Sequence, residues 1–380
     1  MVKIAKGIKT QYILLLLLGF SCGIENNTGS QNQIAPTYYL EKVDSIQIDR
    51  ENIIRVLDYS PANNHFLAFD QVTKEFLVFN DQGQILESVY REGEGPNEYN
   101  SSLIAASFND ENGGYFVLSS IEFLRYNEKW EVEERFRFNS YVQLRFYSGP
   151  KVTVPYYTLS GTSEHYFFTS FFSGINTFVG SNAKEISPNH LIEQYNPTKK
   201  GLEWKLPFET ELLPEFESNE ESGKIKPTQV FSLDKEANLL YLTFERSKEI
   251  GLYDIAEDFK LQKKIKFDHE SFFHSNKSKN TGLFNFGDDK FVVLYYQGLS
   301  EAATEARKIN NSGFPLHDPS LYSLILLEDG FQQEMEFPLN CEPHLEFIKL
   351  PGNRIMLRDK HKGDKESEYS KYSIFEFKQK

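Results

Sequence analysis

The segment Asp268–His274 carries residue types that could bind a metal. It reads Asp-His-Glu-Ser-Phe-Phe-His, with His269 and His274 five positions apart. The zinc-protease motif instead places two histidines four positions apart on one helical face, with a glutamate beside the first. At a spacing of five the two imidazoles would diverge on a helix, and the surrounding pattern predicts strand and loop. Zinc hydrolysis is therefore disfavoured, while binding of calcium or another divalent cation is left open.

The glycine-rich segment Arg91–Tyr99 raises the question of a phosphate site. It reads Arg-Glu-Gly-Glu-Gly-Pro-Asn-Glu-Tyr. A phosphate-binding glycine loop is followed by a helix whose N-terminus faces the anion. Here the strand pattern resumes after the glycines, and Glu92, Glu94 and Glu98 would repel phosphate. We predict a tight structural connection whose glycines supply the backbone geometry, with a ligand-binding loop as the alternative.

No other motif marks a catalytic centre. The remaining histidines are spread along the chain without ligand spacing, at His65, His165, His190, His317, His344 and His361. No Gly-x-Ser-x-Gly elbow is present to mark a hydrolase nucleophile. The 55 acidic residues are too many to single out a glycosidase pair, which need only meet in space. The sequence therefore assigns no catalytic residue and favours a protein that is not an enzyme, without deciding the question.

Charge excludes some partners. The formal net charge is -14, and the first 21 residues hold three lysines and no acid, so the remainder carries 38 basic against 55 acidic residues, or -17. Nucleic-acid binding needs Lys/Arg clusters that neutralise phosphates. We therefore expect no nucleic-acid partner and no docking of the folded domain to anionic lipid.

The N-terminus predicts export. Three lysines precede the apolar run Tyr12–Phe20, which at about nine residues is too short to cross a hydrocarbon core that needs about 20. Ser21 and Cys22 follow, an arrangement that resembles a bacterial lipobox, although Gly19 stands where leucine is usual. We predict a signal peptide over residues 1–21, lipidation at Cys22, a flexible tether over 22–34 and a location at the outer membrane of a Gram-negative cell. The alternative is an ordinary cleaved signal with an incidental cysteine.

The number of cysteines agrees with the predicted export and lipidation. Cys22 and Cys341 are the two cysteines of the chain, and acylation of Cys22 would leave no intramolecular disulfide. An exported chain without disulfides depends on its core, which about 350 residues can supply. We expect Cys341 to be a buried small hydrophobe rather than a catalytic thiol.

Strand signals recur at a regular spacing. Aromatic residues make up 15% of the chain, and short apolar runs are separated by turn signals such as Asp329-Gly330. The second strand of each group starts near residues 65, 115, 165, 238, 290 and 353. A repeat of about 40–50 residues, each with three or four strands, is typical of a β-propeller. We predict an all-β fold with six blades, an insertion over 196–228 and one helix over 301–309; a pair of β-sandwiches or a β-helix would be the competing folds.

The two ends of the chain complement each other. The run 38–48 has a strand pattern but no group of its own, while the last group stops one strand short. The N-terminal strand could therefore join the last blade and remove the open sheet edges at the seam. We predict one propeller domain over 35–380, closed in this way.

A family resemblance fits these features. The predicted lipobox, tether and six strand groups, with the element formed by Gly93, Gly95, Pro96, Glu98 and Tyr99, resemble the uncharacterised TolB-like six-bladed β-propeller lipoproteins of Bacteroidota. Those proteins often carry a Gly-x-Gly-Pro-x-Glu-aromatic element at a blade junction. The resemblance covers about residues 35–380 and implies the fold and the location, but no activity.

Topology indicates where a binding site would lie. In a propeller, the loop between the second and third strands of a blade emerges on the same face as the connection to the next blade. That face would gather 91–100, 269–280, 298–320 and 359–370, and long loops on a rigid scaffold are where binding residues concentrate. We predict a recognition face there, with these candidate residues: Arg91, Glu98, Tyr99, His269, His274, Tyr296, His317, Asp318, Arg358 and His361.

Two functions follow from this reasoning. The first is a membrane-anchored, non-catalytic binding or scaffold lipoprotein whose propeller face engages an envelope protein, a peptide or a glycan, with no cofactor required. The alternative is a metal-dependent hydrolase or lyase of the cell envelope that uses the central funnel of the propeller. The identity of the ligand and the oligomeric state are not set by the sequence.

Overall fold

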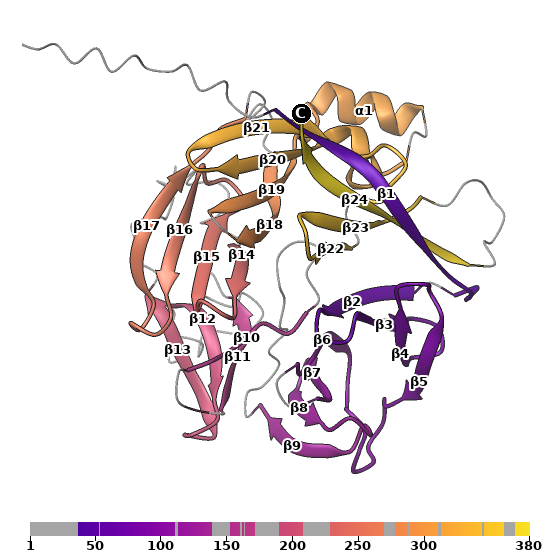
Figure 1. The fold of residues 1–380 in the computed structure, drawn as a ribbon, viewed down its shortest axis with the longest axis vertical. Helices are drawn as coiled ribbons and strands as arrows, with labels where there is room; N and C mark the ends of the chain where they lie inside the picture. The colour runs from indigo at the N-terminus through magenta and orange to yellow at the C-terminus, as the bar shows by residue number, and fades with distance from the viewer. Residues whose placement is uncertain are drawn as a thin grey trace, which may run out of the picture. The chain divides into compact units, whose positions relative to one another are not determined.

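Antiparallel strands form six sheets in the part of the chain that the computed structural model describes (Figure 1). The described residues are 37–52, 54–110, 113–138, 153–159, 162, 164–171, 190–207, 229–269, 278–287, 289–310, 313–343, 346–360 and 369–380. They belong to one compact unit, Thr37–Lys380. The predicted signal peptide and tether, with Cys22, lie outside the described residues.

Each sheet is a blade of four strands. In blades 1 to 5 the strands follow sequence order outward from the innermost, whereas the outer strand of blade 6 comes from the N-terminus. Blade 1 contains β2 (Ile54–Ser60), β3 (His65–Asp70), β4 (Glu75–Asn80) and β5 (Ile85–Tyr90). Blade 2 contains β6 (Leu103–Phe108), β7 (Tyr115–Ser119), β8 (Glu122–Tyr126) and β9 (Val132–Arg137). Blade 3 contains β10 (Tyr156–Thr158), β11 (His165–Phe171), β12 (His190–Asn196) and β13 (Gly201–Pro207).

Blades 4 to 6 complete the ring. Blade 4 contains β14 (Gln229–Asp234), β15 (Leu239–Phe244), β16 (Glu249–Asp254) and β17 (Lys260–Lys266). Blade 5 contains β18 (Lys279–Gly287), β19 (Lys290–Tyr296), β20 (Tyr322–Glu328) and β21 (Phe331–Glu336). Blade 6 contains β22 (Phe347–Leu350), β23 (Arg354–Arg358), β24 (Ser370–Gln379) and, as its outer strand, β1 (Tyr38–Ile48). The prediction of a six-bladed β-propeller is therefore confirmed.

The N-terminal strand closes the ring as predicted. β1 pairs antiparallel with β24 from Tyr38 opposite Gln379 to Ile48 opposite Ser370. The backbone N–H of Lys380 also donates to the carbonyl oxygen of Thr37 at 2.8 Å. The last blade thus takes its fourth strand from the other end of the chain, and β24 is left with no open edge.

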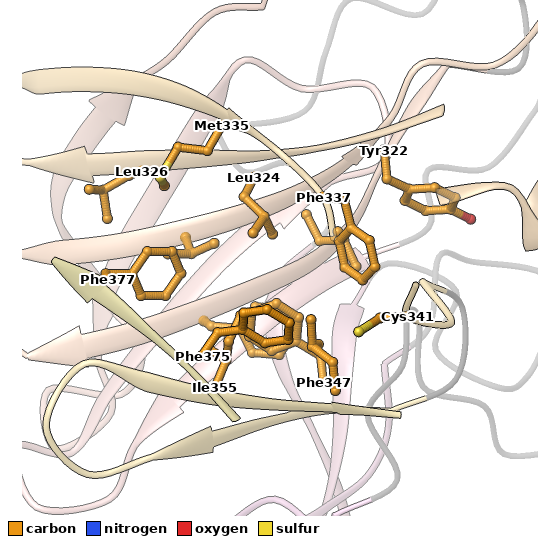
Figure 2. Close-up of a cluster of buried hydrophobic side chains, with 14 of the residues drawn as sticks. Tyr322, Leu324, Leu326, Met335, Phe337, Cys341, Phe347, Ile355, Phe375 and Phe377 are labelled. Atoms are coloured by element: carbon orange, nitrogen blue, oxygen red, sulfur yellow. The ribbon is translucent and has the colours of Figure 1, made fainter. Parts of the chain in front are cut away.

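The cores lie between blades rather than within them. Six clusters of buried hydrophobic side chains each join two neighbouring blades. Figure 2 shows the cluster between blades 5 and 6, where Leu324 and Phe337 of one blade face Phe347 and Phe375 of the other. Cys341 lies in this cluster and is fully buried, as the sequence predicted.

Two-sided packing explains the sequence patterns of the strands. The middle strand β19 is buried along its whole length, because its side chains contact a neighbouring blade on each face of the sheet. The outer strand β21 instead shows regular alternation of exposed and partly buried residues. A strand that is apolar throughout therefore marks the middle of a blade, and an alternating strand marks its rim.

Two further predictions have different outcomes. The helix α1 (Glu301–Ile309) has the predicted bounds and begins at Ser300, whose side chain accepts from the N–H of Ala303. The insertion predicted over 196–228 missed a strand, because Gly201–Pro207 is β13, the outer strand of blade 3. The rest of that segment, 208–228, lies outside the described residues.

The two faces of the propeller differ in the length of their connections. One face carries only turns of two to six residues, and we call it the short-turn face. The opposite face, here called the long-loop face, carries every connection longer than six residues: 91–102, 138–155, 172–189, 208–228, 267–278, 297–321, 337–346 and 359–369. Because strands are antiparallel, both the loop between the second and third strands and the connection to the next blade emerge on this face.

Tyr38 fastens the closing strand to blade 5, so Tyr38→Ala tests the closure. The Tyr38 side chain is 8% exposed, its hydroxyl donates to the carboxylate of Glu328, and the ammonium of Lys290 lies 4.5 Å from its ring centroid. We expect loss of this ring to lower the free energy of unfolding by about 3 kcal/mol. Urea denaturation with Tyr39→Ala as the matched control checks this, because Tyr39 is 36% exposed and should cost about 0.5 kcal/mol or less. Equal losses in the two variants would contradict the role given to Tyr38.

Candidate functional site

The described candidate residues share the long-loop face. Arg91, Glu98 and Tyr99 lie in the connection from β5 to β6, and His269 lies in the connection from β17 to β18. Tyr296 ends β19, Arg358 ends β23, and His317 and Asp318 lie between β19 and β20. His274 and His361 lie outside the described residues. The candidates differ in what their side chains contact, and that difference separates structural residues from available ones.

The glycine-rich connection is held by its own glutamate. The carboxylate of Glu98 accepts a hydrogen bond from the N–H of Gly95 at 2.7 Å. A Cβ at Gly93 would collide with that carboxylate, so a side chain cannot be accommodated there without displacing it. Arg135 donates to the carbonyl oxygen of Glu98 at 2.6 Å, and Tyr99 is fully buried against Phe76.

These contacts agree with the structural interpretation of the segment. Arg91 also serves the fold, because its guanidinium donates to the carbonyl oxygens of Trp130 at 3.2 Å and Tyr90 at 2.9 Å. The Glu98 and Tyr99 side chains are engaged within the blade 1–2 junction. The connection from β5 to β6 is therefore a rigid part of the scaffold.

His269 belongs to a buried polar network in blade 5. Its Nε2 lies 3.2 Å from Oγ of Ser323 and 2.8 Å from Oε1 of Glu334, and the Ser323 hydroxyl donates to Glu334 at 2.8 Å. A hydrolytic triad needs the histidine to contact serine and acid through different ring nitrogens. Here one nitrogen faces both partners, and Ser323 is 3% exposed. Among the described residues, the network therefore joins the β17–β18 connection to blade 5 and lacks the geometry of a catalytic triad.

The segment between β19 and β20 presents apolar side chains to solvent. Helix α1 turns Ala302, Ala306 and Ile309 outward, and none of its residues is buried. The side chains of Ile309 and Phe314 are 82% and 78% exposed, and that of Leu316 is 46% exposed. We call Ile309, Phe314 and Leu316 the outer patch. Apolar residues gathered on an exposed loop of a rigid scaffold are a common feature of interaction surfaces.

Asp318 fixes the base of this segment. Its carboxylate accepts from the N–H of Ser320 at 3.0 Å and also from the guanidinium of Arg307. Burial alone would raise the pKa of Asp318, but the hydrogen bonds from Ser320 and Arg307 outweigh burial and lower the pKa. Tyr296 is 3% exposed and packs against Tyr322, whereas His317 is exposed near Phe314.

A buried charged cluster lies beneath the long-loop face at the seam between blades 1 and 6. It consists of Arg55 from β2, Glu346 just before β22, Arg358 at the end of β23 and Tyr372 from β24. Arg358 and Tyr372 both donate to the carbonyl oxygen of Ile54, at 3.4 and 3.0 Å. Glu346 is 2% exposed, and within the described residues neither of its carboxylate oxygens has a hydrogen-bond partner.

Burial in this cluster shifts the pKa values of Glu346 and Arg55. Burial raises the pKa of Glu346 to about 7, although the positive charges of Arg358 and Arg55 favour the ionised form. The backbone N–H groups of Glu346 and Val56 lie close enough to act in the same direction as the arginines. Burial also lowers the pKa of Arg55, and the buried Nε of Arg55 makes no hydrogen bond in the part of the chain that the structure describes. The carboxyl of Glu346 therefore keeps its proton to a higher pH than an exposed glutamate does.

Of the residues in this cluster, Arg358 was predicted from the sequence as a site residue, whereas Arg55 and Glu346 were not. A charged residue within the apolar run Ile54-Arg55-Val56-Leu57 was the available signal for Arg55. Glu346 gave no comparable signal, because it lies in a connection between strands and its partners are far away in the sequence. Ser323 and Glu334, the partners of His269, were missed for the same reason.

A second charged group lies at the short-turn ends of the inner strands. The ammonium of Lys235 lies 3.7 Å from the ring centroid of Tyr156, and the carboxylate of Asp58 accepts from the N–H of Phe108 at 2.9 Å. Burial raises the pKa of Asp58 to about 6, and the charge of Lys235 partly offsets the effect. These contacts link blades 1 to 4.

Metal ligands do not gather in the part of the chain that the structure describes. No group of three or more His, Cys, Asp or Glu side chains there is arranged to hold a metal ion. Within the same residues, no helix is long and apolar enough to cross a membrane.

Comparison with known proteins supports the fold. No family model and no curated protein matches the chain. A solved member of the DUF4221 family from Bacteroides vulgatus is similar with a TM-score of 0.64 and 9% identity, over 90% of this chain and 99% of that one. A Bacteroides fragilis protein whose name describes it as exported has a TM-score of 0.48 and 12% identity, over 91% and 95% of the two chains. A streptogramin B lyase has a TM-score of 0.41 and 11% identity, over 90% and 98%. Identities this low show similarity of fold alone, and the last two matches carry no further argument.

Gly93→Ala tests the structural role of the glycine-rich connection. The added Cβ should displace the Glu98 carboxylate from the N–H of Gly95 and cost about 2 kcal/mol of unfolding free energy, the value of a charge-assisted hydrogen bond. Gly201→Ala is the control, because its Cβ would meet nothing closer than 3.8 Å. Urea denaturation of both variants measures the difference. A Gly93→Ala protein as stable as the control would show that Glu98 does not hold this connection.

Glu346→Gln tests the buried carboxyl at the seam. The ordinary pKa of 4.5 applies in the unfolded chain and a value of about 7 in the folded protein, so the folded state binds the proton more tightly. The native protein should therefore lose stability as pH rises from about 4.5 to about 7, by up to about 3 kcal/mol. Glu346→Gln should lack this loss and be more stable than the native protein at pH 8. Denaturation at pH 5 and pH 8, with the exposed Glu94→Gln as the control, measures it. A variant with the native pH profile would refute the assignment.

Proposed function

We propose that this protein is a membrane-anchored, non-catalytic binding or scaffold lipoprotein that recognises its partner through the long-loop face. The observation that carries this proposal is the asymmetry of the connections. Every connection longer than six residues emerges on that face, whereas the opposite face has only short turns. Long connections are costly to order and tend to be kept where they bind something.

The outer patch is the best described part of this surface. Ile309, Phe314 and Leu316 are exposed on a segment fixed at its base by Asp318 and Arg307. Burial of such side chains in a complex would supply about 25 cal/mol for each Å² removed from water. The ring of His317 lies beside the patch, near Phe314. The partner we propose is an envelope protein, a peptide or a glycan, and no nucleic acid.

The anchor follows from the sequence. A basic, short apolar signal that ends before Cys22 supports export and acylation, and we propose the outer membrane of a Gram-negative cell as the location. Within the resemblance to TolB-like propeller lipoproteins, the Gly93–Tyr99 element is a blade junction, and its internal contacts support that role. The alternative function, a metal-dependent hydrolase or lyase of the envelope, would require a tightly bound divalent metal.

A thermal-melting screen of the mature chain with Cys22→Ser tests this proposal. The protein is melted with calcium, zinc or EDTA, and with panels of peptides and glycans. A ligand at 100 times its dissociation constant should stabilise the folded state by about 2.7 kcal/mol. We expect a stabilising peptide or glycan whose effect is lost in Phe314→Ser and kept in Leu86→Ser, a control that alters an exposed apolar residue on the rim strand β5. A large loss of stability in EDTA that one metal restores would favour the metal-dependent enzyme instead.

A further inference from the structure

Arg55 has an unpaired guanidinium in the interior of the propeller. Within the described residues its buried Nε has no hydrogen-bond partner, and the guanidinium forms no ion pair. Arg135 and Arg307, by contrast, pair with Glu122 and Asp318. A guanidinium carries five N–H donors, and donors that are removed from water without a partner lower the stability of a protein. Arg55 therefore calls for an acceptor that the described chain does not supply.

The position of Arg55 leaves it open to a ligand. It is the second residue of β2, the innermost strand of blade 1, and inner strands begin at the long-loop face. Its neighbours Ile54 and Val56 are fully buried in the cluster between blades 6 and 1, whereas Arg55 itself is partly exposed. Because inner strands border the propeller axis, solvent and a ligand reach Arg55 from the axis or from the long-loop face.

Glu346 is the acid that acts on Arg55. Each of the two lowers the free energy of the other's charged form, yet no ion pair joins them within the described residues. Arg358 of β23, Tyr372 of β24 and the backbone N–H of Val56 also act on the Glu346 carboxyl. Arg358 and Tyr372 both donate to the carbonyl oxygen of Ile54. Arg55 keeps its own donors for a group from outside the cluster.

A carboxylate is the group that fits an unpaired guanidinium best. Its two oxygens accept two parallel N–H bonds, and such charge-assisted pairs are stronger than bonds to neutral acceptors. An ammonium ligand would be repelled by Arg55, and a neutral hydroxyl would leave the positive charge uncompensated. The outer patch on the same face offers apolar contacts, which suit the side chains of a peptide better than the hydroxyl groups of a sugar.

We propose that Arg55 binds the C-terminal carboxylate of a peptide at the long-loop end of the inner strands. This inference rests on the proposed function, because it names the class of ligand that the long-loop face takes. Glu346 tunes the affinity without touching the ligand. When Glu346 is ionised, its negative charge offsets that of Arg55 and repels the carboxylate; when it is protonated, the charge of Arg55 is available to the ligand.

A minimal peptide tests the site. The Cys22→Ser protein is titrated with N-acetyl-trialanine and with its C-terminal amide at equal ionic strength, and the melting temperature gives the dissociation constant. We expect the acid, and not the amide, to stabilise the native protein at pH 6. Arg55→Met should bind the acid about tenfold more weakly or worse, the loss expected for a bond between charged groups. Arg354→Met is the matched control, because Arg354 begins β23 at the short-turn end and should leave binding unchanged.

The pH dependence separates a binding role from a structural one. Burial raises the pKa of Glu346 to about 7, so the protonated fraction falls about tenfold between pH 6 and pH 8. The acetylated peptide stays ionised over this range, and its affinity for the native protein should fall by up to about tenfold. Glu346→Gln should bind equally well at both pH values. An affinity of the native protein that does not change with pH would overturn the role given to Glu346.

The remaining outcomes distinguish this inference from the proposed function. Equal binding of acid and amide, or equal binding by Arg55→Met and the native protein, would overturn the carboxylate site. Stabilisation by glucuronate but not by the peptide would overturn the peptide in favour of an acidic sugar. Trialanine has no large side chain for the outer patch, so Phe314→Ser should still bind it. Larger peptides that bind only through Phe314, with no response to trialanine, would overturn this inference and leave the proposed function standing.

Discussion

The antiparallel ladder between β1 and β24 joins the two ends of the chain, and the rest of the propeller depends on it. Without β1, blade 6 would keep three strands and expose the edge of β24. The clusters between blades 5 and 6 and between blades 6 and 1 would each lose side chains from β1, such as Tyr38 and Ile46. Pairing of β1 with β24 closes the whole intervening chain into one large loop. Because the entropic cost of closing a loop grows only slowly with its length, this single ladder can hold six blades together.

Aromatic packing between blades explains why so many phenylalanines and tyrosines occur in a chain whose described part contains no disulfide. Phe284 of blade 5 stacks on Phe347 of blade 6 with ring centroids 3.7 Å apart, and Phe76 of blade 1 lies 4.9 Å from Trp130 of blade 2. Each blade is too thin to hold a core of its own, so its side chains must meet those of a neighbour on both faces. The rigidity that results allows the connections on one face to vary in length without loss of the fold.

The buried charged residues differ in how well their charges are compensated. Glu122 is fully buried and is held by Arg135 and Arg137, so its charge is compensated. Glu346 is as deeply buried but makes no ion pair within the described residues, and its carboxyl retains a proton at pH values where an exposed glutamate would not. Because Glu346 is buried without such compensation, the stability of the junction between blades 6 and 1 comes from the neighbouring apolar clusters. His269 also uses polar contacts structurally, since its contacts with Ser323 and Glu334 fasten the β17–β18 connection to blade 5.

The sequence by itself determined the elements that local patterns encode. Turn signals and short apolar runs predicted the start of the second strand of each blade to within one residue, and they predicted α1 at its observed bounds. The spacing of the groups indicated six blades closed by residues 38–48. It could not place β13, because Gly201–Pro207 lies in a polar stretch whose strand character comes from pairing with β12. Nor could it bring Arg55 to Glu346 or His269 to Ser323. The two residues of each pair are far apart in the chain. Local patterns of hydrophobicity and turn residues do not predict which distant side chains come into contact. Tertiary structure alone decided them, because ring closure and inter-blade packing fix the neighbours of each strand.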